Sequence, residues 1–91
     1  MQFYYENVKG LGSVVVSHHA LKRIEEEGIS EELFKKVLLT PIGSDTPDSL
    51  DIVWRERNGI RLVINIDPDV NSGAKVVKTV YRIQAQAKAR R

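Results

Sequence analysis

The sequence has 91 residues, of which 42% are hydrophobic and 29% charged, as is usual for a single small globular domain. It contains no cysteine, which excludes disulfides, thiolate zinc sites and cysteine nucleophiles. No apolar run reaches the roughly 18 residues that a membrane span requires. The first residues do not resemble a secretory signal, so we expect a cytoplasmic protein without a membrane partner.

The formal net charge of +2 hides an uneven distribution along the chain. Residues 1–74 carry eight Lys or Arg against twelve Asp or Glu, whereas residues 75–91 carry six basic residues and no acid. Such a basic end predicts either contact with a polyanion or an acidic partner, or only a solubilising tail. The composition leaves both interpretations open.

The chain begins with a pattern typical of a short strand or extended arm, over residues 3–8. The valines at positions 14–16 then lead into a first helix, which we expect over residues 18–27. Ser17 is a suitable N-cap for that helix, and Gly28 is a common C-terminal stop.

A second helix is expected to begin after Ser30, another N-cap residue. It ends at Thr40-Pro41, because a residue before proline avoids helical backbone angles. Its apolar residues recur with helical spacing and predict one buried face. They are Leu33, Phe34, Val37 and Leu38.

A β-hairpin is the clearest feature of the second half of the chain. Residues 50–57 and 60–67 flank Asn58-Gly59, a pair that favours a type I′ turn. We expect residues 41–49, before the hairpin, to form a loop. The two-residue turn also determines which residues face each other across the hairpin: Trp54 with Val63, and Glu56 with Arg61.

The last predicted strand covers residues 75–83, with Val77, Thr79, Tyr81 and Ile83 on one face. Residues 1–83 then form one domain, and residues 84–91 a basic tail. The expected fold is α+β, with two N-terminal helices on one face of a mostly antiparallel sheet of three to four strands.

Most common catalytic patterns are excluded by the residues present. His18 and His19 are adjacent and point in different directions from a helix, and there is no third histidine. We therefore expect no metal site and no cofactor.

Two other catalytic motifs are also excluded. Ser17 beside His18 lacks the strand–turn–helix setting of a nucleophilic serine. The glycines at positions 10 and 12 lack the lysine of a phosphate-binding loop.

Metal-independent RNA cleavage is the chemistry that the remaining residues can support. It requires a base, an acid and cations around the phosphate. His19 suits the base or acid, and Arg23, one turn later, suits a phosphate oxygen. Thr79 and Tyr81 suit a hydroxyl contact and a stacking or proton-donating phenol. The residues expected to attract the RNA backbone are Lys78, Arg82, Lys88, Arg90 and Arg91.

The same residues also have an ordinary structural interpretation. Arg23 can form a surface ion pair with Glu26 or Glu27, worth about 0.3–0.5 kcal/mol. His19 can be an exposed first-turn residue, and Thr and Tyr are favoured in strands in any case. The residues alone leave both interpretations open.

Two short motifs resemble a family of small bacterial and phage domains. The first is Ser17-x-His19-Ala20-x-x-Arg23 followed by Gly28-Ile29-Ser30, and the second is the strand Val76-Val77-Lys78-Thr79-Val80-Tyr81. The resemblance covers roughly residues 14–83. That family is similar to the barnase–EndoU–colicin–RelE superfamily of RNase toxins, whose fold packs N-terminal helices on a curved antiparallel sheet.

The resemblance implies a cleft that carries His19, Arg23, Thr79 and Tyr81, and a toxin-like, metal-independent endoribonuclease with RNA as substrate and an antitoxin as partner. Glu27 departs from the family, which usually has arginine there, and a carboxylate at this position would neutralise Arg23. The alternative is therefore a degenerate, non-enzymatic accessory module on the same fold, which binds a host protein or a nucleic acid. The sequence does not indicate an oligomeric state.

Overall fold

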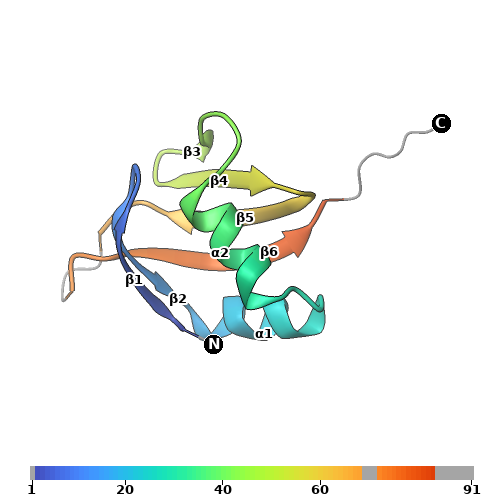
Figure 1. The fold of residues 1–91 in the computed structure, drawn as a ribbon. Coiled ribbons are helices and arrows are strands. Elements are labelled where there is room, and N and C mark those ends of the chain that lie inside the picture. The colour runs from blue at the N-terminus through green and yellow to red at the C-terminus, as the bar shows by residue number, and fades with distance from the viewer. Residues whose placement is uncertain (1, 69–71, 84–91) are drawn as a thin grey trace.

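A computed structural model describes residues 2–68 and 72–83 of the chain (Figure 1). The described residues form an α+β structure, as predicted, with two helices and one mixed sheet of six strands. The predicted tail over residues 84–91 lies outside the described residues. The elements in chain order are β1 (Tyr4–Val8), β2 (Gly12–Val16), α1 (His18–Glu26), α2 (Glu31–Leu39), β3 (Thr46–Ser49), β4 (Ile52–Arg57), β5 (Ile60–Asn65) and β6 (Lys75–Arg82).

The sheet is larger than the sequence predicted. Its strand order is β1-β2-β6-β5-β4-β3, and β2 runs parallel to β6 while every other neighbouring pair is antiparallel. The prediction of three to four strands missed two of them. The valines at positions 14–16 form β2 itself, because they pair with both β1 and β6. Part of the predicted loop forms β3, an edge strand, where Pro47 is tolerated.

Both helices begin at the residue after the predicted cap. The hydroxyl oxygen of Ser17 accepts a hydrogen bond from the backbone N–H of Ala20 at 3.1 Å. The hydroxyl oxygen of Ser30 accepts one from the N–H of Leu33, also at 3.1 Å. Each cap therefore satisfies a donor that the first helical turn leaves without a partner.

The predicted hairpin between β4 and β5 is confirmed. Asn58 and Gly59 have φ values of 55° and 75°, the left-handed conformations that a type I′ turn requires. Glu56 faces Arg61 across the hairpin and Trp54 faces Val63, as expected from a two-residue turn.

A β-bulge in β6 changes the predicted assignment of its faces. Val63 pairs with Thr79 but Ile64 pairs with Val77, so Lys78 is an extra residue in the strand. Val77 is therefore fully buried on the helix side of the sheet, and its predicted place on one face with Thr79 is wrong. Strict alternation along the strand does not hold across the bulge.

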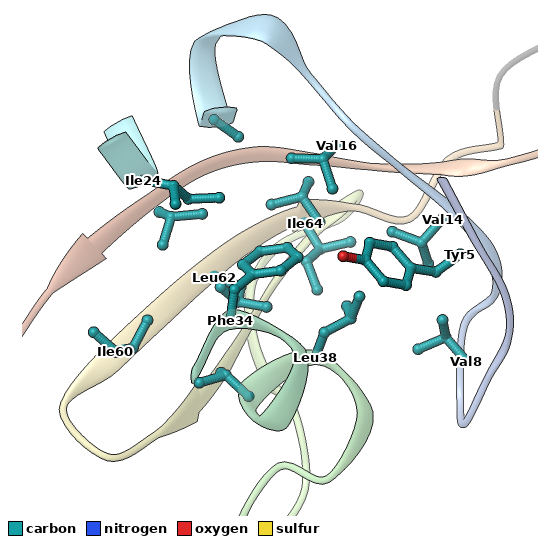
Figure 2. Packing of buried hydrophobic residues seen from close by; sticks show 14 of the residues in the cluster. Tyr5, Val8, Val14, Val16, Ile24, Phe34, Leu38, Ile60, Leu62 and Ile64 are labelled. Atoms are coloured by element: carbon teal, nitrogen blue, oxygen red, sulfur yellow. The ribbon is translucent and has the colours of Figure 1, made fainter. Parts of the chain in front are cut away.

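The hydrophobic core lies between the helices and one face of the sheet (Figure 2). Phe34 and Leu38 of α2 are fully buried, and the ring of Phe34 lies 6.0 Å from that of Tyr5 on β1. Burial of each such side chain contributes about 1.5–3 kcal/mol. The core-facing residues of β5 are Ile60, Leu62 and Ile64. Neither helix covers the opposite face of β4, β5 and β6, and Thr79 and Tyr81 lie on that face.

Candidate functional site

The first helix is hydrogen-bonded to the last strand at its N-terminal end. The backbone N–H of Ser17 donates to the carbonyl oxygen of Val77 at 3.1 Å. The hydroxyl of Ser17 donates to the carbonyl oxygen of Lys78, also at 3.1 Å. His19 follows this anchor by two residues on the helix, and Thr79 follows it by one residue on the strand.

The C-terminal end of α1 is held to the same strand. The guanidinium of Arg82 donates through Nε to the carbonyl oxygen of Glu27 at 3.1 Å and through Nη2 to that of Gly28 at 3.4 Å. A cation at this position also suits the negative end of the helix dipole. Arg82, expected to contact nucleic acid, therefore has a structural role. The helix lies beside the half of β6 that carries Tyr81 (Figure 1).

His19 and Arg23 lie on one flank of α1. Leu21 and Glu25, on the other flank, border a hollow that reaches the beginning of α2. Positions 19 and 23 are about 160–200° around the helix from position 21, at about 100° per residue. The imidazole and the guanidinium are therefore on the side of the helix that is turned away from α2.

The two side chains on this flank differ in their partners. The side chain of His19 is exposed and makes no hydrogen bond or ion pair within residues 2–68 and 72–83. Arg23 donates from Nη2 to the carboxylate of Glu27 at 3.1 Å and from Nη1 to that of Glu26 at 3.4 Å. A phosphate that approaches Arg23 must compete with these two carboxylates.

Thr79 and Tyr81 both point to the uncovered face of the sheet, where their neighbours come from β5. Thr79 faces Val63, and Tyr81 faces Arg61. The phenol oxygen of Tyr81 accepts a hydrogen bond from Nη1 of Arg61 at 3.1 Å. Among the described residues, no hydrogen bond or ion pair joins His19 or Arg23 to Thr79 or Tyr81.

A cluster that the sequence analysis did not single out occupies the same face. The guanidinium carbon of Arg61 lies 4.0 Å from the centre of the Trp54 ring and 5.7 Å from that of Tyr81. Arg61 also forms an ion pair with Glu56, which faces it across the hairpin. The predicted hairpin register already placed Glu56 against Arg61. The sequence did not predict how β6 pairs with β5, and this pairing places Tyr81 on the other side of Arg61.

The cluster affects the protonation of Arg61. Partial burial by itself lowers the pKa of the guanidinium, but the hydrogen bonds to Tyr81 and Glu56 and the charge of Glu56 outweigh it. The pKa of Arg61 is therefore raised above its ordinary value. Arg61 is a permanent cation whose charge is largely balanced by Glu56.

A family model described as a domain of unknown function, DUF4258, matches residues 16–82. The chain belongs to the DUF4258 family. No curated protein and no solved structure matches the chain significantly. The family description gives no activity, so the similarity to RNase toxins stays a prediction.

The segment that matches DUF4258 contains the parts of the candidate site that the structure describes. It begins at the last residue of β2 and ends at the last residue of β6. The helix α1, with His19 and Arg23, and the cluster around Arg61 both fall within it. The strand β1 lies outside it. The described candidate residues are therefore part of the segment that matches DUF4258.

A buried arginine on the helix side of the DUF4258 domain is structural. Arg55 is 3% exposed, and its guanidinium donates two hydrogen bonds to the carboxylate of Asp45, at 2.8 and 2.9 Å. Two more bonds reach the carbonyl oxygens of Leu38, at 2.7 Å, and Lys9, at 3.0 Å. Alternation along β4 places Arg55 on the core face next to Val53, and this pattern was a signal that the sequence analysis overlooked.

The other cations expected to bind nucleic acid are in different situations. The side chain of Lys78 is exposed and has no hydrogen-bond or ion-pair partner among the residues described. The three tail residues Lys88, Arg90 and Arg91 lie outside the described residues. In the described part of the chain, no three His, Asp or Glu side chains gather as a metal site would require. In the same part, no helix is long and apolar enough to span a membrane.

Proposed function

We propose that this DUF4258 domain binds RNA along the junction of α1 and β6, and that His19 transfers a proton in metal-independent cleavage of the RNA backbone. The observation that carries the proposal is the attachment of α1 to β6 at both ends. It holds α1, which carries His19 and Arg23, beside the half of the strand that carries Thr79 and Tyr81.

The proposed reaction uses the RNA's own nucleophile. A base removes the proton from a ribose 2′-hydroxyl, whose oxygen attacks the adjacent phosphorus, and the bond from phosphorus to the 5′ oxygen breaks. An acid protonates the departing 5′ oxygen, so the products are a 2′,3′-cyclic phosphate and a 5′-hydroxyl. An imidazole can take or give this proton at neutral pH. His19 is exposed and has no described partner that would hold it away from RNA.

The remaining proposed roles belong to other groups on α1 and β6. Lys78 and Arg23 are the cations that would hold the non-bridging oxygens of the phosphate. Tyr81 has a phenol that can provide the second proton-transfer group. Arg23 can act in this way only after the phosphate displaces Glu26 and Glu27.

A second candidate is a non-enzymatic RNA-binding module that uses the same surface. The ion pairs of Arg23 favour it, because they neutralise the cation that cleavage would use. The hydrogen bond from Arg61 to Tyr81 favours it as well, because it ties the phenol to a neighbour on β5 rather than to His19. In this case RNA binding survives His19→Ala but weakens when Lys88, Arg90 and Arg91 are removed.

An RNA-cleavage assay in EDTA tests the first candidate. His18→Ala is a matched control for His19→Ala, because the two histidines are adjacent and both exposed. We expect the wild type and His18→Ala to leave cyclic phosphate ends, and His19→Ala to be at least about a hundredfold slower. DNA of the same sequence should stay intact, since it lacks the 2′-hydroxyl.

Two results would contradict catalysis by His19. One is equal cleavage by His19→Ala and the wild type. The other is RNA that the wild type binds but leaves intact, which assigns the domain to the second candidate.

A further inference from the structure

The uncovered face of the sheet presents aromatic rings and a guanidinium held in fixed positions. In the sheet register, Arg61 lies between Glu56 on β4 and Tyr81 on β6. Trp54 and Thr79 flank Val63 in the neighbouring row. These side chains are only partly buried, so their surfaces remain accessible on this face.

Arg61 is held by three contacts rather than extended into solvent. Its guanidinium lies over the Trp54 ring, pairs with Glu56 and donates to the phenol oxygen of Tyr81. The plane of the guanidinium is therefore fixed before any ligand arrives, which reduces the entropy lost on binding. Because Glu56 balances its charge, Arg61 is poorly suited to hold a phosphate. A fixed, neutralised guanidinium beside two rings suits the flat face of a planar ligand.

We propose that Trp54, Arg61 and Tyr81, here called the stacking shelf, bind an unpaired nucleobase of the RNA. This inference rests on the proposed function, which places RNA along β6. Bases that are not paired stack on aromatic side chains and on arginine planes in proteins that recognise single-stranded RNA. The exposed Lys78, next to Thr79 on the same strand, is suited to the phosphate that adjoins the bound base.

The charge of the chain favours a nucleic acid over an acidic protein as the occupant of the shelf. Residues 75–91 carry six basic residues and no acid, so the strand that borders the shelf leads into a basic segment. An acidic peptide would meet the carboxylate of Glu56, which is paired with Arg61 of the shelf. A nucleobase is uncharged and meets no such repulsion, while its backbone is attracted by Lys78 and the residues that follow.

Trp54 is the only tryptophan in the chain, so its fluorescence reports directly on the shelf. The full chain is titrated with a five-residue 2′-O-methyl adenosine oligomer, which cannot be cleaved by the proposed reaction because methylation removes the 2′-hydroxyl nucleophile. A 2′-O-methyl abasic oligomer of the same length carries the same backbone charge without bases. We expect the base-bearing oligomer to quench Trp54 and to bind at least about tenfold more tightly than the abasic one.

Two variants test the shelf, and a third is the matched control. Arg61→Lys keeps the charge but removes the flat guanidinium, and Trp54→Leu keeps apolar volume without a ring. Arg57→Lys changes an arginine of β4 that donates to the carbonyl oxygen of Thr40 on the helix side. With binding followed by anisotropy of labelled oligomers, the first two should lose the preference for bases and Arg57→Lys should keep it. Circular dichroism of each variant checks that it is folded.

The outcomes separate this inference from the proposed function. Equal affinity of the wild type for the two oligomers, or Trp54 emission unchanged at saturation with the base-bearing one, would overturn the shelf even if RNA is cleaved in EDTA. Base-dependent binding that the shelf variants abolish, without any cleavage, supports the shelf and contradicts catalysis by His19. A preference for bases that survives both Arg61→Lys and Trp54→Leu overturns the shelf.

Discussion

The guanidinium of Arg23 lies 3.1 Å from the carboxylate of Glu27, the C-cap residue of α1. The pair is partly exposed, and exposed ion pairs are typically worth about 0.2–1 kcal/mol. Such a pair is weak enough for a phosphate to displace. Glu27 is therefore expected to reduce the affinity of this flank for RNA without closing it to RNA.

Glu27→Gln should raise the affinity of the chain for RNA by up to about fivefold, because a ligand no longer has to break the pair with Arg23. Glu25→Gln is the matched control, since it removes the same charge from the flank of α1 that faces α2. Binding is measured by anisotropy at low and high salt, and the difference between the variants should shrink as salt screens the charges. An equal gain in RNA affinity from Glu27→Gln and Glu25→Gln would contradict this prediction, because it would show that only the net charge of the chain affects binding.

Lys78 and Arg82 lie four residues apart on one strand but should respond differently to substitution. Lys78→Ala should weaken RNA binding and lower the slope of log K against log salt by about 1, as expected for one lost phosphate contact. Its free energy of unfolding should change by less than about 0.5 kcal/mol, since Lys78 is exposed.

Arg82→Ala should instead destabilise the fold by about 1 kcal/mol, because the carbonyl groups of Glu27 and Gly28, at the C-terminal end of α1, lose their donor. Urea unfolding and salt titrations of both variants provide the comparison. If Arg82→Ala strongly lowered the slope of log K against log salt, Arg82 would contact RNA after all, as predicted from the sequence.

Arg55→Leu should destabilise the protein by about 3–5 kcal/mol, because it leaves the carboxylate of Asp45 and two carbonyl oxygens without their donor. Arg55→Lys should recover little of this, since an ammonium cannot reproduce the forked geometry of the guanidinium. Arg57→Leu, on the same strand, serves as the less buried comparison, because Arg57 is only half-buried. Urea unfolding followed by circular dichroism measures all three. Equal losses for Arg55→Leu and Arg57→Leu would argue against this account.

Tyr5 should make stability depend on alkaline pH. Burial of its hydroxyl, together with the nearby carboxylate of Glu31, raises the pKa of Tyr5 above its ordinary value of 10.0. The folded state thus holds this proton more tightly than the unfolded state does. The contribution is fully present below about pH 10 and is lost as the pH rises through the raised pKa.

Tyr5→Phe lacks this contribution, so the difference in free energy of unfolding between wild type and Tyr5→Phe should change above about pH 10 in the direction that disfavours the wild type. Tyr4→Phe, at the exposed neighbouring position, controls for the general effect of high pH. Unfolding in urea at a series of pH values gives the comparison. A difference that stays constant up to the point where both proteins unfold would contradict the expected titration.

Local features of the sequence predicted the helices and the hairpin well. Ser17 and Ser30 cap the first turns of their own helices, and Asn58-Gly59 adopts the backbone angles of its own turn. These interactions span only a few residues, so they can be recognised without knowledge of the fold. The strand pairing that the sequence analysis missed is long-range, because Val14–Val16 pair with residues some sixty positions later. Nothing local to the valines reveals that partner.

In the candidate site, too, local features could be predicted and long-range pairing could not. Helical spacing alone placed His19 and Arg23 on one flank, and the turn placed Glu56 opposite Arg61. The bulge at Lys78 depends on how β6 pairs with β5, and it changed which residues share a face with Tyr81. The bond from Ser17 to the carbonyl oxygen of Lys78 involves the main chain, which carries no signature in the sequence.

The two attachments of α1 to β6 also impose a constraint on length. From Ser17 to Glu27 the helix rises about 15 Å, at about 1.5 Å per residue, and from Lys78 to Arg82 the strand advances about 13 Å. The side chain of Arg82 spans the difference. One residue inserted into α1 would rotate its C-terminal half by about 100° and move the carbonyl oxygens of Glu27 and Gly28 out of reach. The number of residues between Ser17 and Gly28 is thus set by the length of the strand beside the helix. Related chains that conserve the fold should differ in residue type between these two positions but not in the number of residues.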